Sequence, residues 1–205
     1  MNEAQLTTST LDEETARAEV YGLLAALYYA PPSTELYENL RVAATEAPAA
    51  GALLEGSWAE LVASARELTL ANVKSEYDAL FGGVGRPEVY VFGSHYLSGF
   101  LNEKPLAALR TDIAALGLAR DETMPETEDH VAYLCEVMRY LIAGDDVEVA
   151  NLTRQREFFT RHLQPWVAAM CVAIAQHPKA RFYRALAAFT EVFINVESQG
   201  FDMLV

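Results

Sequence analysis

Hydrophobic residues recur every three or four positions along most of the chain, which is the spacing of an α-helix with one buried face. In the first such segment they are Ala16, Val20, Leu23, Leu24 and Leu27. Thr10-Leu-Asp-Glu13 has the form of a capping box, so we expect the helix to begin there. Pro31-Pro32 should end it, because proline has no backbone N–H and clashes with the preceding turn.

The same period predicts helices along the rest of the chain. A capping box at Ser57–Glu60 precedes one apolar stripe that runs to Phe81, and Thr127 is a candidate cap for a helix that Gly144 ends. Strand character is limited to Val89–Phe92. The other expected helices span about 33–46, 105–116, 146–163, 165–176 and 180–198. We therefore predict an all-α fold, a single compact multi-helix domain of about eight to eleven helices.

A polar segment from Ala119 to Glu126 divides this pattern. It is a candidate hinge, at about 118–127, between an N-terminal lobe at about 10–117 and a C-terminal lobe at about 128–198. A hinge between two helical lobes permits a domain-swapped dimer, although a monomer is the default expectation.

The charge balance narrows the range of partners. The 205 residues include 15 Lys and Arg against 29 Asp and Glu, which gives a net charge of -14. Such a surface repels phosphate backbones, so nucleic acid is not an expected partner. It would attract a basic peptide, but the same charge is also compatible with a role in solubility only.

The cysteines and the apolar segments indicate a compartment. Cys135 and Cys171 form no CxxC pair, so neither a zinc site nor a thiol redox motif is predicted. The chain starts Met1-Asn2-Glu3 and has no basic stretch followed by an apolar run, so no signal peptide is expected. The longest apolar stretches, at 21–30 and 165–175, reach about half of the ~20 residues that a membrane span requires. We expect no membrane insertion and a cytoplasmic location.

Catalytic motifs are missing from the sequence. It contains no HExxH, GxSxG or phosphate-binding lysine loop, and its histidines and acids suggest no metal or cofactor site. The glycine-rich segment Gly82–Pro87 follows a predicted helix and lacks the Gly-Lys-Ser/Thr ending, so we interpret it as a connection. The alternative is a nucleotide-binding or hydrolysing enzyme that uses this loop.

Glu126-Thr127-Glu128-Asp129-His130 is the most distinctive local pattern. His130 shares a helical stripe with Leu134, Val137, Met138 and Leu141, so its ring should point inward, with a neighbouring acid holding a ring nitrogen. One interpretation is a structural histidine that pins a loop to a helix. The other is a polar anchor beside an apolar groove.

Tyr77, Leu80 and Phe81 form a second candidate, because they share one helix face directly before the glycine-rich break. Such a face is usually part of the core, but the end of a helix can also line a groove.

These segments resemble landmarks of the TorD/DmsD/NarJ family of redox-enzyme maturation chaperones. The segment from Arg17 to Pro32 is similar to the family's first helix, and Tyr77-x-x-Leu80-Phe81-Gly82 to its aromatic-x-x-Leu-Phe segment. Glu126-x-x-Asp129-His130 resembles its Glu-Pro-x-Asp-His signature, with Thr127 in place of the usual proline. His162–Trp166 and Phe182–Leu186 resemble its C-terminal landmarks.

The resemblance implies a chaperone, not an enzyme. Members of that family bind the N-terminal leader peptide of a molybdopterin-dependent enzyme, often one with a twin-arginine export signal, and hold the apo-enzyme until its cofactor is inserted. The peptide-binding residues would then be Tyr28, Tyr77, Leu80, Phe81, Glu126, Asp129 and His130. This assignment assumes that the segments 77–81 and 126–130 lie close together in space. A structural assembly factor, which binds the mature enzyme and ignores its isolated leader, is the remaining alternative.

Overall fold

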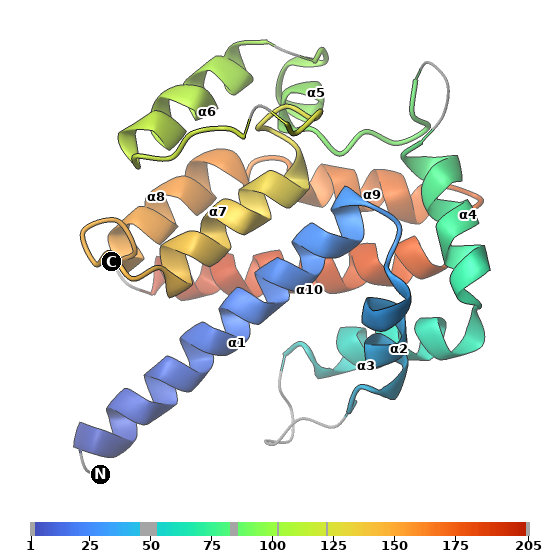
Figure 1. Ribbon diagram of the computed structural model, residues 1–205, viewed down its shortest axis with the longest axis horizontal. Helices are drawn as coiled ribbons and strands as arrows, with labels where there is room; N and C mark the ends of the chain where they lie inside the picture. Colours follow the sequence, from blue (N-terminus) through green and yellow to red (C-terminus); the bar gives the residue numbers. More distant parts are fainter. Residues whose placement is uncertain (1–2, 46–52, 83–85, 102, 122, 204–205) are drawn as a thin grey trace. The chain divides into compact units, whose positions relative to one another are not determined.

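The computed structural model describes residues 3–45, 53–82, 86–101, 103–121 and 123–203, with side chains from residue 13 onward. Ten α-helices lie within these residues, and the only β-structure there is an isolated bridge between Phe92 and His130. The predicted all-α class is therefore confirmed (Figure 1).

The chain forms two compact units, and each contains segments from distant parts of the sequence. The first unit combines residues 1–29 with 92–165, and the second combines 30–91 with 166–205. These boundaries differ from the predicted lobes, because long-range packing and not position along the chain groups the helices. The segment 118–127 lies inside the first unit, and its role as a hinge stays a prediction.

The first unit is organised around α1 (Glu3–Tyr29) and α7 (Val131–Ala143), which lie side by side and run in opposite directions (Figure 1). Helix α8 (Leu152–His162) packs against α7, and α5 (Gly93–Ser98) packs against α6 (Lys104–Ala115). The predicted apolar stripes supply buried residues here, as the pattern requires. They include Leu24, Leu27, Leu134, Met138 and Leu141.

The second unit is organised around α10 (Phe182–Asp202), which packs against α9 (Val167–Gln176), α3 (Glu55–Glu67) and α4 (Leu70–Leu80). Helix α2 (Thr34–Val42) contacts α3. Four residues of the predicted stripe on the last helix are buried, namely Phe182, Leu186, Phe189 and Phe193.

Several predicted helix starts are wrong, because a local capping pattern does not determine whether the preceding residues are also helical. Helix α1 begins at Glu3, so Thr10 lies within it. Helix α3 begins at Glu55, and the Ser57 hydroxyl donates to the carbonyl of Leu54 instead of accepting from a free N–H. The predicted single helix up to Phe81 is divided by Thr69, which caps α4 through a reciprocal pair of hydrogen bonds with Asn72.

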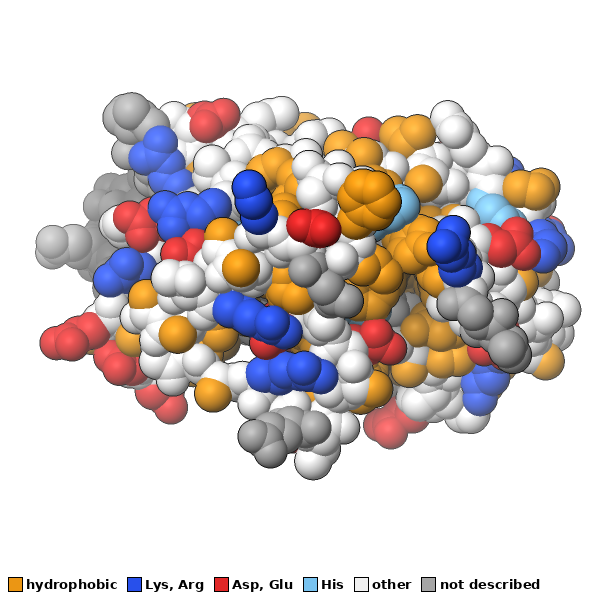
Figure 2. Space-filling view, turned by 90° about the horizontal axis from the view of Figure 1, so that it is seen from above, with side chains coloured by type: hydrophobic (Ala, Val, Ile, Leu, Met, Phe, Trp, Pro, Cys, Tyr) orange, Lys and Arg blue, Asp and Glu red, His pale blue; other side chains and the backbone are white. Residues whose placement is uncertain are grey.

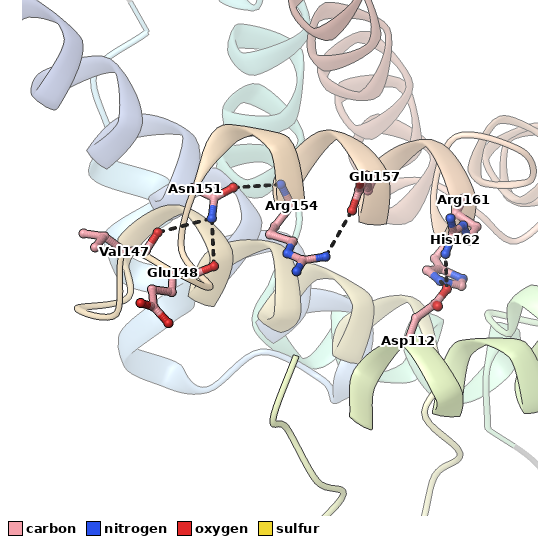
Figure 3. Close-up of polar contacts among 8 residues, drawn as sticks. All are labelled: Asp112, Val147, Glu148, Asn151, Arg154, Glu157, Arg161 and His162. Carbon is pink, nitrogen blue, oxygen red and sulfur yellow. Dashed lines mark hydrogen bonds and ion pairs between the residues drawn. The ribbon is translucent and has the colours of Figure 1, made fainter. Parts of the chain in front are cut away.

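Helix α8 also begins later than predicted, at Leu152 instead of about residue 146 (Figure 3). Asp146 accepts a hydrogen bond from the Glu148 N–H in a turn, and Asn151 then caps the helix by accepting from the Arg154 N–H. The Asn151 amide donates to the carbonyls of Val147 and Glu148. Asp146, an acid of the kind that often precedes a helix, therefore belongs to a turn, and Asn151 caps the helix instead.

At its other end α8 is joined to α6 through Asp112 (Figure 3). One carboxylate oxygen of Asp112 lies 2.8 Å from both the Arg161 guanidinium and the His162 Nε2. Although burial acts in the opposite direction, these two partners lower the pKa of Asp112. This contact fixes α6 against α8 within the first unit.

Candidate functional site

His130 caps the first turn of α7. Its Nδ1 accepts a hydrogen bond of 3.1 Å from the Ala132 N–H, which would otherwise be an unpaired donor of the first turn. The predicted cap, Thr127, lies before the helix, and its hydroxyl donates to Asp129. The prediction for Thr127 is wrong, because the ring of His130 has already taken the capping position.

The ring of His130 is buried, as the apolar stripe predicts, and only 3% of the residue is exposed. It lies among the aromatic rings of Tyr29, Phe92 and Tyr133 at centroid distances of 6.1, 5.0 and 6.0 Å. Burial lowers its pKa to about 4, against a smaller opposing effect of Asp129. His130 is therefore neutral at pH 7, and because Nδ1 accepts a hydrogen bond, its proton is on Nε2.

Asp129 binds α5 and not the imidazole, which corrects the expectation that an acid would hold the ring. Its Oδ2 accepts hydrogen bonds from the backbone N–H of Ser94 at 2.9 Å and from the Ser94 hydroxyl. Its Oδ1 accepts from the Thr127 hydroxyl at 2.6 Å. Three donors thus satisfy a buried carboxylate and fix the loop before α7 to the start of α5.

We expect Asp129→Ala to destabilise the protein by about 1–3 kcal/mol, because it leaves buried donors of Ser94 without an acceptor. Urea unfolding followed by circular dichroism measures the change. Asp121→Ala is the matched control, since Asp121 makes similar bonds to Thr123 on an exposed turn and should cost less than about 1 kcal/mol. Equal losses in the two variants would contradict the assignment.

A pocket of about 550 Å³ lies in the first unit beside this loop. Helices α1, α6 and α7 and residues 118–121, 124 and 128 form its walls, and its surface is almost entirely apolar. The apolar lining residues include Ala25, Tyr29, Ile113, Leu118, Met124, Tyr133, Val137 and Tyr140.

Two tyrosines link this pocket to His130. The rings of Tyr29 and Tyr133 contact both each other and the imidazole, and the Tyr29 hydroxyl lies 3.6 Å from the sulfur of Met124. Burial, with a smaller contribution from Tyr29, raises the pKa of Tyr133 to about 12. The Tyr133 phenol is therefore neutral, and both tyrosine rings pack against the imidazole of His130.

Charged side chains lie on the border of the pocket. They are Arg120, Asp121, Glu128 and Glu136, with three acids and one base. The Glu128 carboxylate is held by the Arg110 guanidinium at 3.0 and 2.9 Å, and Arg120 donates to the carbonyl of Met124. Glu136 is likewise paired, with Arg139 at 3.4 Å, so two of the three acids that line the pocket are neutralised by arginines from outside the lining.

The predicted site residues have different environments. Tyr28 is fully buried, whereas its neighbour Tyr29 lines the pocket. Glu126 is half-buried, and its charge adds to the raised pKa of Tyr133. Asp129 and His130 are not among the lining residues: Asp129 binds Ser94, and the ring of His130 contacts that of Tyr29, which lines the pocket.

Tyr77, Leu80 and Phe81 belong to the second unit. Leu80 is fully buried, and the rings of Tyr77 and Phe81 pack against each other and against Tyr183 at 5.2, 5.8 and 5.0 Å. A groove shared with the segment 126–130 stays a prediction. Residues 83–85 of the glycine-rich segment lie outside the described residues.

Sequence reasoning missed the residues of the pocket itself, among them Tyr29, Met124 and Tyr133. The segment at about 118–127 is predicted as a hinge because it is polar, although Leu118 and Met124 line the pocket. The signal was present in Tyr133, Val137 and Tyr140, which are spaced by four and three residues on α7 and line the pocket, although Val137 is assigned to the buried stripe of His130.

Comparison with known proteins gives the family. Residues 47–172, more than half of the chain, match the family described as nitrate reductase delta subunit. The chain belongs to this family. The nitrate reductase delta subunit match includes α5 to α8, and hence Asp129, His130 and the 118–128 wall of the pocket.

Two curated relatives of this family member are named chaperones. "Chaperone protein TorD" of Vibrio cholerae serotype O1 is 25% identical over 92% of this chain and 93% of its own length. "Chaperone protein TorD" of Shewanella loihica is 26% identical over 90% and 92%. The resemblance inferred from the motifs is confirmed, and the protein is a chaperone of redox-enzyme maturation, not an enzyme.

Among the described residues, no group of histidines, cysteines and acids is arranged to bind a metal ion. Within the same residues, none of the helices combines the length and apolar character needed to cross a membrane.

Proposed function

We propose that this chaperone binds the N-terminal leader peptide of a molybdopterin-dependent oxidoreductase subunit in the cytoplasm and holds the apo-enzyme until its cofactor is inserted. Family membership supports the coarser statement, a chaperone for molybdoenzyme maturation. The observation that carries the finer proposal is the apolar pocket with an acidic border in the first unit.

The pocket suits the apolar part of a leader. Its volume of about 550 Å³ falls within the usual ~300–1,000 Å³ of binding pockets. Tyr133, Val137 and Tyr140 lie along one face of α7, so an apolar helix or extended segment would find several contacts in line.

The border suits the basic part of a leader. Asp121, Glu128 and Glu136 line the pocket, and the whole chain carries a charge of -14. Glu128 and Glu136 are paired with Arg110 and Arg139, so a basic peptide would replace these partners. Figure 2 shows that Lys and Arg side chains also lie on the face that it views, so the acidic surplus is not a uniform coat. Local acids at the pocket would therefore add selectivity to the long-range attraction of a basic peptide.

We expect Val137→Asp to weaken binding of a leader-like peptide about tenfold to hundredfold, because it places a charge on the apolar floor. The probe is a synthetic peptide with two adjacent arginines ahead of an apolar run, titrated by calorimetry. Val147→Asp is the control, since that valine is 78% exposed and does not line the pocket.

Wild-type protein that fails to bind the peptide would overturn the proposal. Equal affinity of Val137→Asp and Val147→Asp for the peptide would also overturn it, because the peptide would then not bind in the pocket. Co-purification of a molybdopterin-dependent enzyme that still binds after its leader is deleted would favour a structural assembly factor instead. We propose a monomer as the working state, which light scattering with and without peptide tests.

A further inference from the structure

Glu128 lines the pocket, and an arginine of the chain itself, Arg110 on α6, already pairs with its carboxylate. Arg110 Nε and one terminal nitrogen lie 3.0 and 2.9 Å from the two oxygens of the Glu128 carboxylate. This is a two-pronged contact, which the planar guanidinium forms and a lysine ammonium does not.

The two partners differ in exposure. The side chain of Glu128 is only 13% exposed and lines the pocket, whereas that of Arg110 is 51% exposed and does not. Although burial acts to raise it, the pKa of Glu128 is lowered by the hydrogen bonds from Arg110 and by the charges of Arg110 and Arg120. The carboxylate is therefore ionised, fixed in position and open toward the pocket, while its arginine partner is able to move into solvent.

We propose that Glu128 is the carboxylate that binds an arginine guanidinium of the leader peptide, and that Arg110 occupies this position until the peptide replaces it. The proposal rests on the proposed function. It adds a residue, Glu128, that makes the site prefer arginine to lysine in the leader. The exchange keeps the half-buried Glu128 carboxylate paired throughout, so it avoids the cost of leaving that charge without a partner.

Arg110 in this scheme is a competitor of the ligand. Because an exposed ion pair of this kind is weak, its removal should strengthen binding of the arginine peptide about twofold to fivefold. A purely structural role, in which Arg110 pins the segment 118–128 to α6, has the opposite consequence. Removing the pin would loosen the pocket wall and weaken binding of every peptide.

The experiment titrates three synthetic peptides, with the paired residues Arg-Arg, Lys-Lys or Gln-Gln ahead of the same apolar run. The proteins are the wild type, Arg110→Gln, Glu128→Gln and Arg154→Gln. The last is the charge control, because Arg154 is 48% exposed, pairs with Glu157 on α8 and does not line the pocket. Arg110→Lys retains the charge without the two-pronged contact.

We expect Arg110→Gln to bind the Arg-Arg peptide about twofold to fivefold more tightly and the Gln-Gln peptide unchanged, with a smaller gain for Lys-Lys. Glu128→Gln should bind Arg-Arg at least about fivefold more weakly and remove the preference over Lys-Lys. Arg110→Lys should lie between the wild type and Arg110→Gln.

The proposed exchange is overturned if Arg154→Gln binds the Arg-Arg peptide as tightly as Arg110→Gln does. It is also overturned if Arg110→Gln binds that peptide more weakly than the wild type. If the peptides bind in the pocket by the Val137→Asp test but ignore both Arg110→Gln and Glu128→Gln, this inference fails and the proposed function stands. If the wild type binds none of them, the proposed function itself fails.

Discussion

Replacing Glu76 by alanine is expected to destabilise the protein by about 3–5 kcal/mol and to lower its Tm by roughly 10 °C. Glu76 is 8% exposed, and its carboxylate accepts hydrogen bonds from the backbone N–H groups of Arg181, Phe182 and Tyr183 at 2.8, 3.1 and 2.8 Å. These are the free donors at the start of α10, which has no cap from its own residues. The negative charge of a carboxylate at this position also interacts favourably with the positive end of the helix dipole.

The control is Glu67→Ala. Glu67 pairs with the Arg181 side chain at the same end of α10, but both partners are mostly exposed, so the change should cost less than about 1 kcal/mol. Thermal and urea unfolding measure both variants. Losses of the same size would show that α10 does not depend on the buried carboxylate.

Folding stability is expected to fall by about 3 kcal/mol through His130 as the pH falls from about 6.5 to about 4. The unfolded histidine binds its proton near pH 6.5, whereas burial lowers the pKa in the folded protein to about 4. Between these values the unfolded state binds more protons, so acid favours unfolding. Above pH 6.5 the contribution is complete and constant.

His130→Asn isolates this effect. Asparagine can still accept from the Ala132 N–H as a cap, but it does not titrate. Its stability at pH 7 should be lower, because it loses the ring contacts with Tyr29 and Phe92, and its decline toward pH 4 should be shallower. His162, whose pKa burial also lowers, is common to both proteins and cancels in the difference. Parallel pH profiles of urea stability would contradict the prediction.

The helical elements were largely predictable, because their signals are local. Pro31-Pro32 ends α1 as expected, Gly117 follows α6 with a φ of 73°, and the apolar stripe of α10 is buried. The misplaced starts of α3 and α8 have different causes. Ser57 lies inside α3 and its hydroxyl donates to a backbone carbonyl, whereas Asp146 belongs to a turn before α8.

The site was predictable only in part. The stripe that contains His130 placed its ring inward correctly, because burial follows from periodicity. The predicted hydrogen bond from a neighbouring acid to that ring was wrong, since Asp129 instead accepts from Ser94, thirty-five positions earlier. Tyr29 was missed although it follows Tyr28, because one residue is a turn of 100° around a helix and separates a core side chain from a pocket side chain.

The sequence by itself determined an all-helical protein, a buried His130 at the start of a helix, and membership of a chaperone family. Only the tertiary structure decided which polar groups are paired and where a pocket opens. The reason is that periodicity along one helix defines its apolar and polar faces, whereas the residues that contact each face come from elsewhere in the chain. Glu76 at the start of α10 and Arg110 on Glu128 are such partners, and no local pattern predicts either one.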